Sequence, residues 1–394
     1  MNDVIIFEEI NCANGKKIGI ATLNAPKSLN ALSKDMISRL FPQLLMWKNQ
    51  PDIAAVLLQG KGEKAFCAGG DIVHLYGAAK EAQADSSLDI EQLIKVGNAD
   101  DKLSPILQDY FTQEYKLDYL IHTFTKPFIV WGSGIVMGGG LGLLVGGSHR
   151  IVTETSRIAM PEISIGLFPD VGASYFLNQM PPGIGLFLAL TGASINSGDA
   201  KYCQLADFYL EQHCKEELVQ KLLRLNFTEN NENNHKEVTR LLADIESSFI
   251  EKIPSSPIQA NQSLIESLVI SLSLSDIISA ISQIKTEEKW LETAQYSLQK
   301  GSVMSAQIAY TQLQLGQTMT LAECFKMELN LAVKSGIFGE FSEGVRALLI
   351  DKDRQPKWHY SSVQAIDGDI HDWFFKPLWN EEEHPLSTLE SISL

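Results

Sequence analysis

The sequence predicts an α/β fold that is followed by a helical region. Up to about residue 192, short apolar runs and amphipathic stretches follow one another in the order strand, strand, helix. A chain of 394 residues with 45% hydrophobic residues can bury a large core. We therefore expect an α/β core with the functional site over residues 1–195, and a helical region packed on it over residues 196–394. The helical spacing of the second half is clearest at Val238, Leu241, Leu242, Ile245 and Phe249.

The chain begins with the pattern of two strands and a capped helix. Residues 4–7 and 18–23 are typical of short strands joined by an Asn-Gly turn. Residues 54–58 (AAVLL) indicate a buried strand. Between them, Ser33 is a suitable N-cap for a helix whose apolar positions are Met36, Ile37, Leu40 and Leu44.

A polar stretch and an amphipathic helix come next. Residues 82–105 are polar and irregular, which predicts a surface insert. Residues 107–124 have the pattern of a helix, and Glu114 lies on it. The helical pattern alone favours a solvent-exposed acid at this position. The apolar side of this helix is formed by Tyr110, Phe111, Leu117 and Leu120.

The middle of the chain is rich in glycine. Residues 127–131 predict a strand, residues 138–144 a helix, and residues 151–153 and 157–159 a further strand pair. The stretch 128–148 carries no charge and is long enough to raise the question of a membrane span. Its many glycines favour a buried strand that leads into a buried helix instead.

Two signals organise the C-terminal half. Residues 226–235 (NFTENNENNH) are a polar break and a candidate linker. Thr320 and Glu323 have the spacing of a capping box, which predicts a helix from there to about residue 333.

The composition limits the function classes. A net charge of −16 without a basic patch argues against nucleic acid as the main partner. The five cysteines are an odd number without a CxxC pair, so we expect reduced thiols and no zinc site or disulfide set. The acidic start of the sequence lacks the basic segment of a signal peptide, and we expect a cytoplasmic protein.

Two glycine turns, each after a buried strand, are the first candidates for chemistry. They are Gly69-Gly70 and the triplet 138–140. Their backbone N–H groups could converge on one carbonyl oxygen, and a donor of this kind is typically worth about 10²–10³ in rate. Tight packing alone would explain the glycines equally well. Glu162 and Asp170 follow in an apolar neighbourhood, which favours acid/base or nucleophilic chemistry.

Other site motifs do not fit. The run GGGLGLLVGG misses the GxGxxG spacing of a dinucleotide site, because Val145 stands where the third glycine is needed. The sequence has no GxSxG, HExxH or P-loop motif, so a serine hydrolase, zinc protease or NTPase lacks support. His149 is better explained as a hydrogen-bonding or surface residue than as a catalyst.

Several motifs together resemble the crotonase (enoyl-CoA hydratase/isomerase) superfamily. They are FCAGGD at 66–71, MGGGLG at 137–142, MPE at 160–162 and LNAPKSLNAL at 23–32. The acyl-CoA hydrolase branch is the most similar, through GLFPD at 166–170, QEY at 113–115 and FSEGVRALLIDK at 341–352. The resemblance covers nearly the whole chain.

The resemblance implies a crotonase-like spiral of ββα units, followed by helices, that binds an acyl-CoA thioester. Gly70 and Gly139 match the oxyanion-hole positions, while Glu162 and Asp170 match catalytic acids. Coenzyme A belongs to the substrate, and the resemblance implies no further cofactor and no metal. It also allows for a homo-oligomer, without a nucleic-acid or membrane partner. The positions implied for substrate binding are Glu114, Gly139, Lys27, Leu29, Ala68, Gly69, Asp71 and Ile72.

One departure from the hydratases decides the expected reaction. Their GGGxE motif supplies a second catalytic glutamate, and this chain has Gly142 there. We therefore expect hydrolysis of a 3-hydroxyacyl-CoA, such as 3-hydroxyisobutyryl-CoA in valine breakdown. Glu162 would act as nucleophile through an anhydride or as base on water, and the sequence leaves both open. The alternatives are an enoyl-CoA hydratase/isomerase and a non-catalytic CoA-binding protein.

Overall fold

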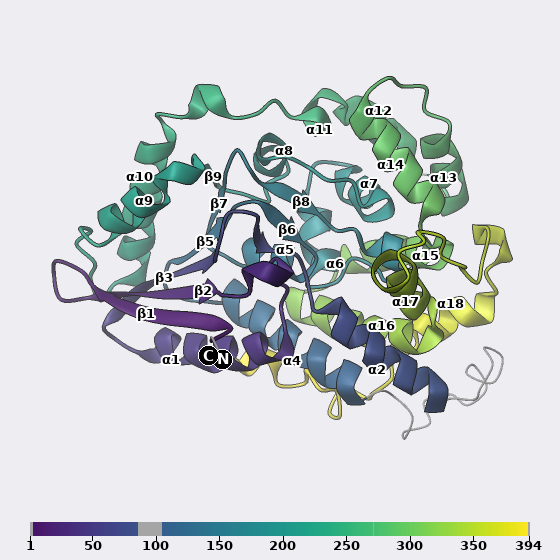
Figure 1. Ribbon diagram of the computed structural model, residues 1–394, viewed down its shortest axis with the longest axis horizontal. Coiled ribbons are helices and arrows are strands. Elements are labelled where there is room, and N and C mark those ends of the chain that lie inside the picture. Colours follow the sequence, from purple (N-terminus) through teal and green to yellow (C-terminus); the bar gives the residue numbers. More distant parts are fainter. Residues whose placement is uncertain (1–2, 86–104, 271, 393–394) are drawn as a thin grey trace.

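The computed structural model describes residues 3–85, 105–270 and 272–392. Two β-sheets lie at its centre, one with six strands in the order β1-β2-β3-β5-β7-β9 and one with three in the order β4-β6-β8 (Figure 1). The strands are β1 Ile5–Asn11, β2 Lys17–Leu23, β3 Ile53–Gly60, β4 Ala65–Cys67, β5 Phe128–Gly132, β6 Ile135–Met137, β7 His149–Val152, β8 Arg157–Ala159 and β9 Phe208–Tyr209.

The chain winds as a spiral in which each turn adds one strand to each sheet. β3, β5 and β7 run parallel in the large sheet, and β4, β6 and β8, which follow them, run parallel in the small one. This confirms the predicted ββα spiral. The predicted strand pair at 151–153 and 157–159 is wrong in one respect: β7 pairs with β5 and β9, whereas β8 pairs with β6. The two strands are consecutive in the chain but belong to different sheets.

Both faces of the six-stranded sheet are buried, because side chains of a strand alternate between its faces. In β3, Val56 and Leu58 belong to the main core, while Ala55 and Leu57 belong to a second apolar cluster on the opposite face. α9 Lys215–Leu222 and α10 Asn231–Glu246 cover this second face (Figure 1).

The N-terminal predictions are confirmed. β1 and β2 form an antiparallel pair, and Gly15 in the turn between them has φ +88°, which favours glycine. Ser33 caps the next helix by accepting the N–H of Met36. The helices that connect the strands are α1 Lys34–Asn49, α2 Ile72–Asp85, α4 Pro105–His122, α5 Gly139–Val145, α6 Ala173–Phe176, α7 Ile184–Thr191 and α8 Ser197–Tyr202.

Two predicted irregular segments are partly helical. α2 includes residues 82–85 of the expected insert, and residues 86–104 lie outside the described part. The linker predicted at 226–235 is wrong: Phe227 is buried in the second apolar cluster, and α10 begins at Asn231. Asn230 caps α10, so the polar run serves as a helix start.

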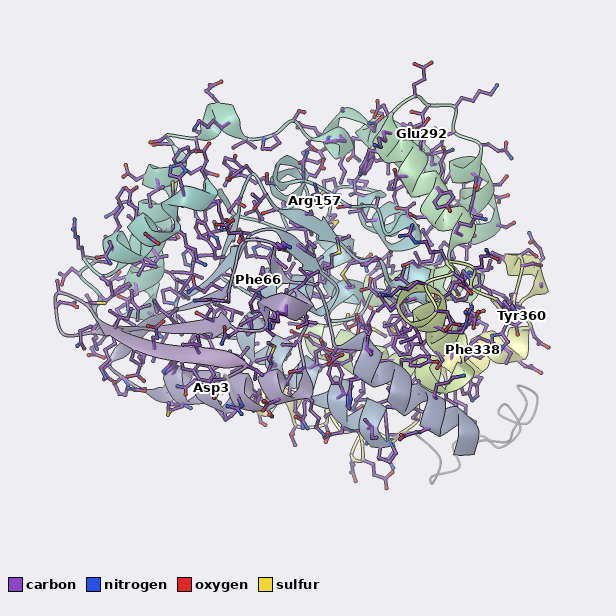
Figure 2. All side chains as sticks on the ribbon, viewed as in Figure 1. Asp3, Phe66, Arg157, Glu292, Phe338 and Tyr360 are labelled. Carbon is purple, nitrogen blue, oxygen red and sulfur yellow. The ribbon has the colours of Figure 1, made fainter. Side chains whose placement is uncertain are left out.

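The C-terminal half consists mainly of helices. The predicted capping box is present, with Thr320 accepting from Glu323 N–H and the Glu323 side chain accepting from Thr320 N–H. That helix is α16 and continues to Phe338, whose ring stacks with Tyr360, centroids 6.4 Å apart (Figure 2). The further helices are α11 Pro257–Ala260, α12 Gln262–Val269, α13 Leu274–Ser282, α14 Lys289–Lys300, α15 Val303–Gly316, α16 Leu321–Phe338, α17 Glu340–Val345, the π-helix η6 Arg346–Ile350 and α18 Gly368–Phe375.

The two halves share structure. β9 lies beyond residue 195, yet it pairs with β7 and completes the six-stranded sheet. The main apolar core also includes residues from both halves, such as Phe168 and Phe325. The boundary at residue 195 stays a prediction.

The charge-free stretch 128–148 forms β5, β6 and α5. Among the helices that the structure describes, none has both the length and the apolar character needed to cross a membrane.

Candidate active site

The candidate site forms where the three parallel strands of the small sheet end. β4, β6 and β8 lie side by side, with Cys67 opposite Val136 and Met137 opposite Ala159. Parallel strands present their carboxyl ends at the same edge. The segments that follow them carry Gly69-Gly70, Gly138-Gly139 and Glu162, so three separate sequence motifs meet there.

The two glycine turns adjoin each other. Gly69 has φ +103° and Gly138 has φ +49°, which are backbone conformations that favour glycine. A Cβ atom on Gly139 would lie 3.6 Å from the backbone nitrogen of Gly70 and would collide with Glu114 Oε1. Gly139 is the first residue of α5, so its N–H has no partner within the helix. This arrangement suits an oxyanion hole, although that role stays a prediction.

A cavity of about 340 Å³ opens at this point. The predicted residues that line it include both glycine turns and all three predicted acids, Glu114, Glu162 and Asp170. No lysine, arginine or histidine lines it. The other lining residues are Ala68, Ile72, Leu75, Tyr110, Phe111, Met137, Pro161, Ser164, Ile165, Leu167 and Leu348.

Glu114 and Glu162 are buried acids. Glu114 on α4 is only 2% exposed, so the helical pattern was wrong to favour a solvated acid there. Glu162 opens a short 3-10 helix, η2 Glu162–Ile165, and is 5% exposed. Its Oε1 lies near Gly138, and its Oε2 has no hydrogen-bond partner among the described residues. A free, buried carboxylate oxygen beside the glycine turns is available for a substrate.

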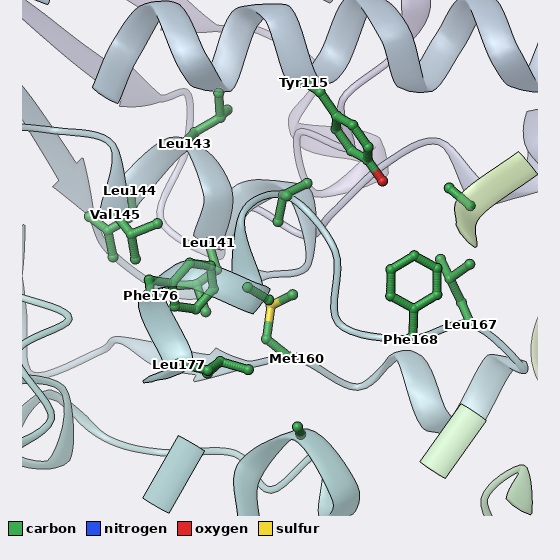
Figure 3. Close-up of a cluster of buried hydrophobic side chains, with 14 of the residues drawn as sticks. Tyr115, Leu141, Leu143, Leu144, Val145, Met160, Leu167, Phe168, Phe176 and Leu177 are labelled. Atoms are coloured by element: carbon green, nitrogen blue, oxygen red, sulfur yellow. The ribbon is translucent and has the colours of Figure 1, made fainter. Parts of the chain in front are cut away.

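Asp170 is held in place by Tyr115. The Tyr115 hydroxyl donates a hydrogen bond of 2.8 Å to Asp170 Oδ2. Figure 3 shows Tyr115 reaching from α4 toward the segment that carries Leu167 and Phe168. The sequence analysis quoted Tyr115 within a motif but gave it no role. Its position one residue after Glu114 was the available signal.

The three acids raise one another's pKa values. Burial raises the pKa of Glu114 well above its usual range, and the charges of Asp170 and Glu162 raise it further. Burial and the Asp170 charge likewise raise the pKa of Glu162. Burial raises the pKa of Asp170 to about 6, against the opposing effect of the Tyr115 hydrogen bond. Such shifts in a cavity are typical of catalytic carboxyl groups.

Two more buried acids stand behind the cavity, and the sequence analysis missed both. Asp118 lies one turn after Glu114 on α4, and neither of its carboxyl oxygens has a hydrogen-bond partner in the described ranges. Burial, followed by the charge of Glu114, raises its pKa. Glu328 on α16 accepts the N–H groups of Gly172 and Ser174, and burial raises its pKa to about 8.

The predicted coenzyme A positions do not all meet. Ala68, Gly69 and Ile72 line the cavity of the acids, whereas Lys27 and Leu29 line a second cavity of about 650 Å³. Asp71 lines neither of these cavities and accepts the N–H of His74 at the start of α2. The second cavity also contains Lys61 and Lys64.

Two other expectations are settled by the packing. His149 is buried and contacts Thr239 Oγ1 at 3.0 Å, which confirms a hydrogen-bonding residue remote from the acids. All five cysteines are buried thiols without a disulfide.

The chain belongs to the enoyl-CoA hydratase/isomerase family, whose family model matches residues 18–375. This confirms the resemblance to the crotonase superfamily.

Similar proteins point to one branch of the family. The 3-hydroxyisobutyryl-CoA hydrolase, mitochondrial, of Gallus gallus is 36% identical over 92% of this chain and 88% of its own length. The human protein of the same name is 33% identical over 96% and 90%. An enoyl-CoA hydratase structure from Rhodobacter sphaeroides matches with a TM-score of 0.76 and 28% identity, covering 95% of this chain and 98% of its own. A carnitinyl-CoA dehydratase structure from Mycobacterium thermoresistibile has a TM-score of 0.78 and 27% identity, covering 95% and 97%.

Gly139→Ala should lower kcat by at least about 10-fold, because a side chain there displaces Glu114 and crowds the Gly70 N–H. Steady-state hydrolysis of an acyl-CoA measures the effect. Gly77→Ala is the matched control, since a Cβ on Gly77 meets no atom within 4 Å. Equal activity of the two variants would remove Gly139 from the site.

Asp170→Asn should stabilise the ligand-free protein at neutral pH. The folded pKa of about 6 exceeds the ordinary value of 3.8, so ionising Asp170 costs stability as pH rises from about 3.8 to 6, and the full cost remains above 6. Asparagine keeps an acceptor for Tyr115 without a charge. Thermal unfolding of both proteins from pH 5 to 8 should show a higher melting temperature for the variant at pH 7 and a shrinking difference below pH 6. A difference that is independent of pH would contradict the raised pKa.

Proposed function

We propose that this protein hydrolyses 3-hydroxyisobutyryl-CoA to 3-hydroxyisobutyrate and free coenzyme A, the reaction in valine breakdown expected from the sequence. The observation that carries the proposal is the free, buried Glu162 carboxylate oxygen in the same cavity as the two glycine turns. The names of the hydrolase relatives, which match over about nine-tenths of both chains, support the substrate.

The reaction begins with the thioester carbonyl oxygen between the N–H groups of Gly70 and Gly139. These donors stabilise the negative charge that develops on this oxygen when the carbonyl carbon is attacked. Glu162 then acts in one of two ways. It attacks the carbon, forming a mixed anhydride and releasing the coenzyme A thiolate, and water cleaves the anhydride. Alternatively, it takes a proton from the water that attacks directly.

Asp170 and Glu114 complete the substrate site. Asp170 lines the cavity with its Oδ2 fixed by Tyr115, and it accepts the 3-hydroxyl group of the acyl chain. Glu114 forms the wall beside Gly139 and limits where the acyl chain can lie. Because the lining residues include no cation, protons are what balance the charges of these acids.

Coenzyme A extends from this cavity toward the cavity that contains Lys27. Three lysines, Lys27, Lys61 and Lys64, line that second cavity together with one acid, Glu63. A local excess of positive charge suits phosphate groups even in a protein whose net charge is −16. Coenzyme A enters with the substrate, and we propose no other cofactor and no metal.

Hydrolysis fits the site better than hydration. A Cβ atom on Gly142 would lie 2.7 Å from Val171 Cβ, so the place of the second hydratase glutamate is filled. Hydration stays the second candidate, because a solved enoyl-CoA hydratase shares the fold over 95% of this chain. A non-catalytic CoA-binding protein would not need the buried Glu162 and Asp170. The cytoplasmic location and a homo-oligomer stay predictions; the hydrolase relatives carry the word mitochondrial in their names.

The purified protein should release free thiol from 3-hydroxyisobutyryl-CoA and hydrate crotonyl-CoA poorly. Thiol release and enoyl absorbance, followed with each substrate, distinguish the reactions. Glu162→Gln should lower kcat by at least about 10²-fold while coenzyme A binding persists, because the side chain keeps its size but loses its charge. Crotonyl-CoA hydration without thiol release would establish the second candidate, and binding without either reaction would favour the non-catalytic one.

Asp170→Asn should impair 3-hydroxyisobutyryl-CoA more than isobutyryl-CoA, which lacks the hydroxyl group. A site built to pair with a hydroxyl group discriminates strongly for it, and the variant weakens that pairing. The ratio of kcat/KM for the two substrates measures the effect. Equal losses would mean that Asp170 serves water or Glu162 instead.

A further inference from the structure

The segment that carries Asp170 adopts an unusual backbone. Val171 has φ +53° and Gly172 has φ +87°. A β-branched residue such as valine is an outlier in this region, at a cost of order 1–3 kcal/mol. Such a conformation persists only where the surroundings hold it. The Asp170 segment must therefore be fixed by contacts outside itself.

Glu328 supplies two of these contacts. Its Oε2 accepts the N–H of Gly172 at 2.7 Å, and its Oε1 accepts the N–H of Ser174 at 2.8 Å. Glu328 has no exposed surface, and it reaches this segment from α16 across 156 residues of chain. Hydrogen bonds to a carboxyl group in a water-free interior are among the strong ones. Both oxygens are thus committed to the two residues that follow Val171.

Two other helices hold the same segment. Gln312 on α15 donates to the Pro169 carbonyl oxygen at 2.5 Å, and Tyr115 on α4 donates to Asp170 itself. Each contact fixes a different residue, in order along the chain. Glu328 lies behind the cavity and does not line it, so it would act on the substrate only through Asp170.

We propose that Glu328 is a positioning residue: by holding the N–H groups of Gly172 and Ser174, it fixes the left-handed turn at Val171 and so aims the Asp170 carboxyl group at the 3-hydroxyl group of the substrate. The inference rests on the proposed function. It gives the helical C-terminal half a direct part in recognising the hydroxyl group.

A double-mutant cycle tests this inference. Glu328→Gln keeps the size, but its NH₂ group faces an N–H donor, so one of the two hydrogen bonds is lost. We expect kcat/KM for 3-hydroxyisobutyryl-CoA to fall about 10-fold or more, and the value for isobutyryl-CoA to fall clearly less. In the Asp170→Asn background, Glu328→Gln should have little further effect, because the group that it positions is already changed.

The matched control is Asp199→Asn. Asp199 is also buried and also accepts two backbone N–H groups, those of Asn196 and Ile258, but it does not line the cavity. It should lower both substrates equally and multiply with Asp170→Asn. If Glu328→Gln fails to fold, Glu328→Asp replaces it, since the shorter side chain keeps the charge but cannot reach both N–H groups.

Fully multiplicative effects of Glu328→Gln and Asp170→Asn, or equal losses on both substrates as for Asp199→Asn, would overturn the positioning role. These outcomes differ from failure of the proposed function, in which the wild-type protein itself releases no thiol from either substrate.

Discussion

Burial of carboxyl groups without a cation is the constraint on which the site depends. Five acids, Glu114, Asp118, Glu162, Asp170 and Glu328, are each at most 5% exposed and influence one another's pKa values. Ionising all of them together in an apolar interior would cost far more than any single interaction returns. The cluster therefore retains protons that exposed carboxyl groups would lose. Acids in this state are poised to exchange protons near neutral pH, which is what acyl transfer to water requires.

The spiral fold makes this cluster possible. Each turn of the chain ends a short strand of the small sheet at the same edge, so glycine turns and Glu162 meet although about 90 residues separate Gly70 from Glu162 in the sequence. The large sheet and α4 enclose this edge from behind. Access is left only where the absence of Cβ atoms, at Gly70 and Gly139, lets a substrate approach the backbone.

Local signals predicted much of the fold, and motifs predicted most of the site. The caps at Ser33 and Thr320 depend on neighbouring residues, so the sequence sufficed for both. The burial of Glu114 was also within reach, because it lies four residues after Tyr110 and three before Leu117, on the apolar side of its helix. Glu328 was beyond reach: its partners lie 154 and 156 residues away, and no periodicity connects them. The polar run before α10 was misread because helix caps and linkers use the same residues.

The Asp170 segment links two features that the sequence presents as independent. Val171 occupies the space that a side chain at position 142 would need, with 2.7 Å between Val171 Cβ and a Cβ on Gly142. The turn that brings Asp170 into the cavity and an acid at position 142 therefore exclude each other in this backbone. Loss of one acid and gain of the other are a single structural change. It follows that restoring glutamate at position 142 alone would not restore a hydratase site, because the segment held by Glu328, Gln312 and Tyr115 would have to move first.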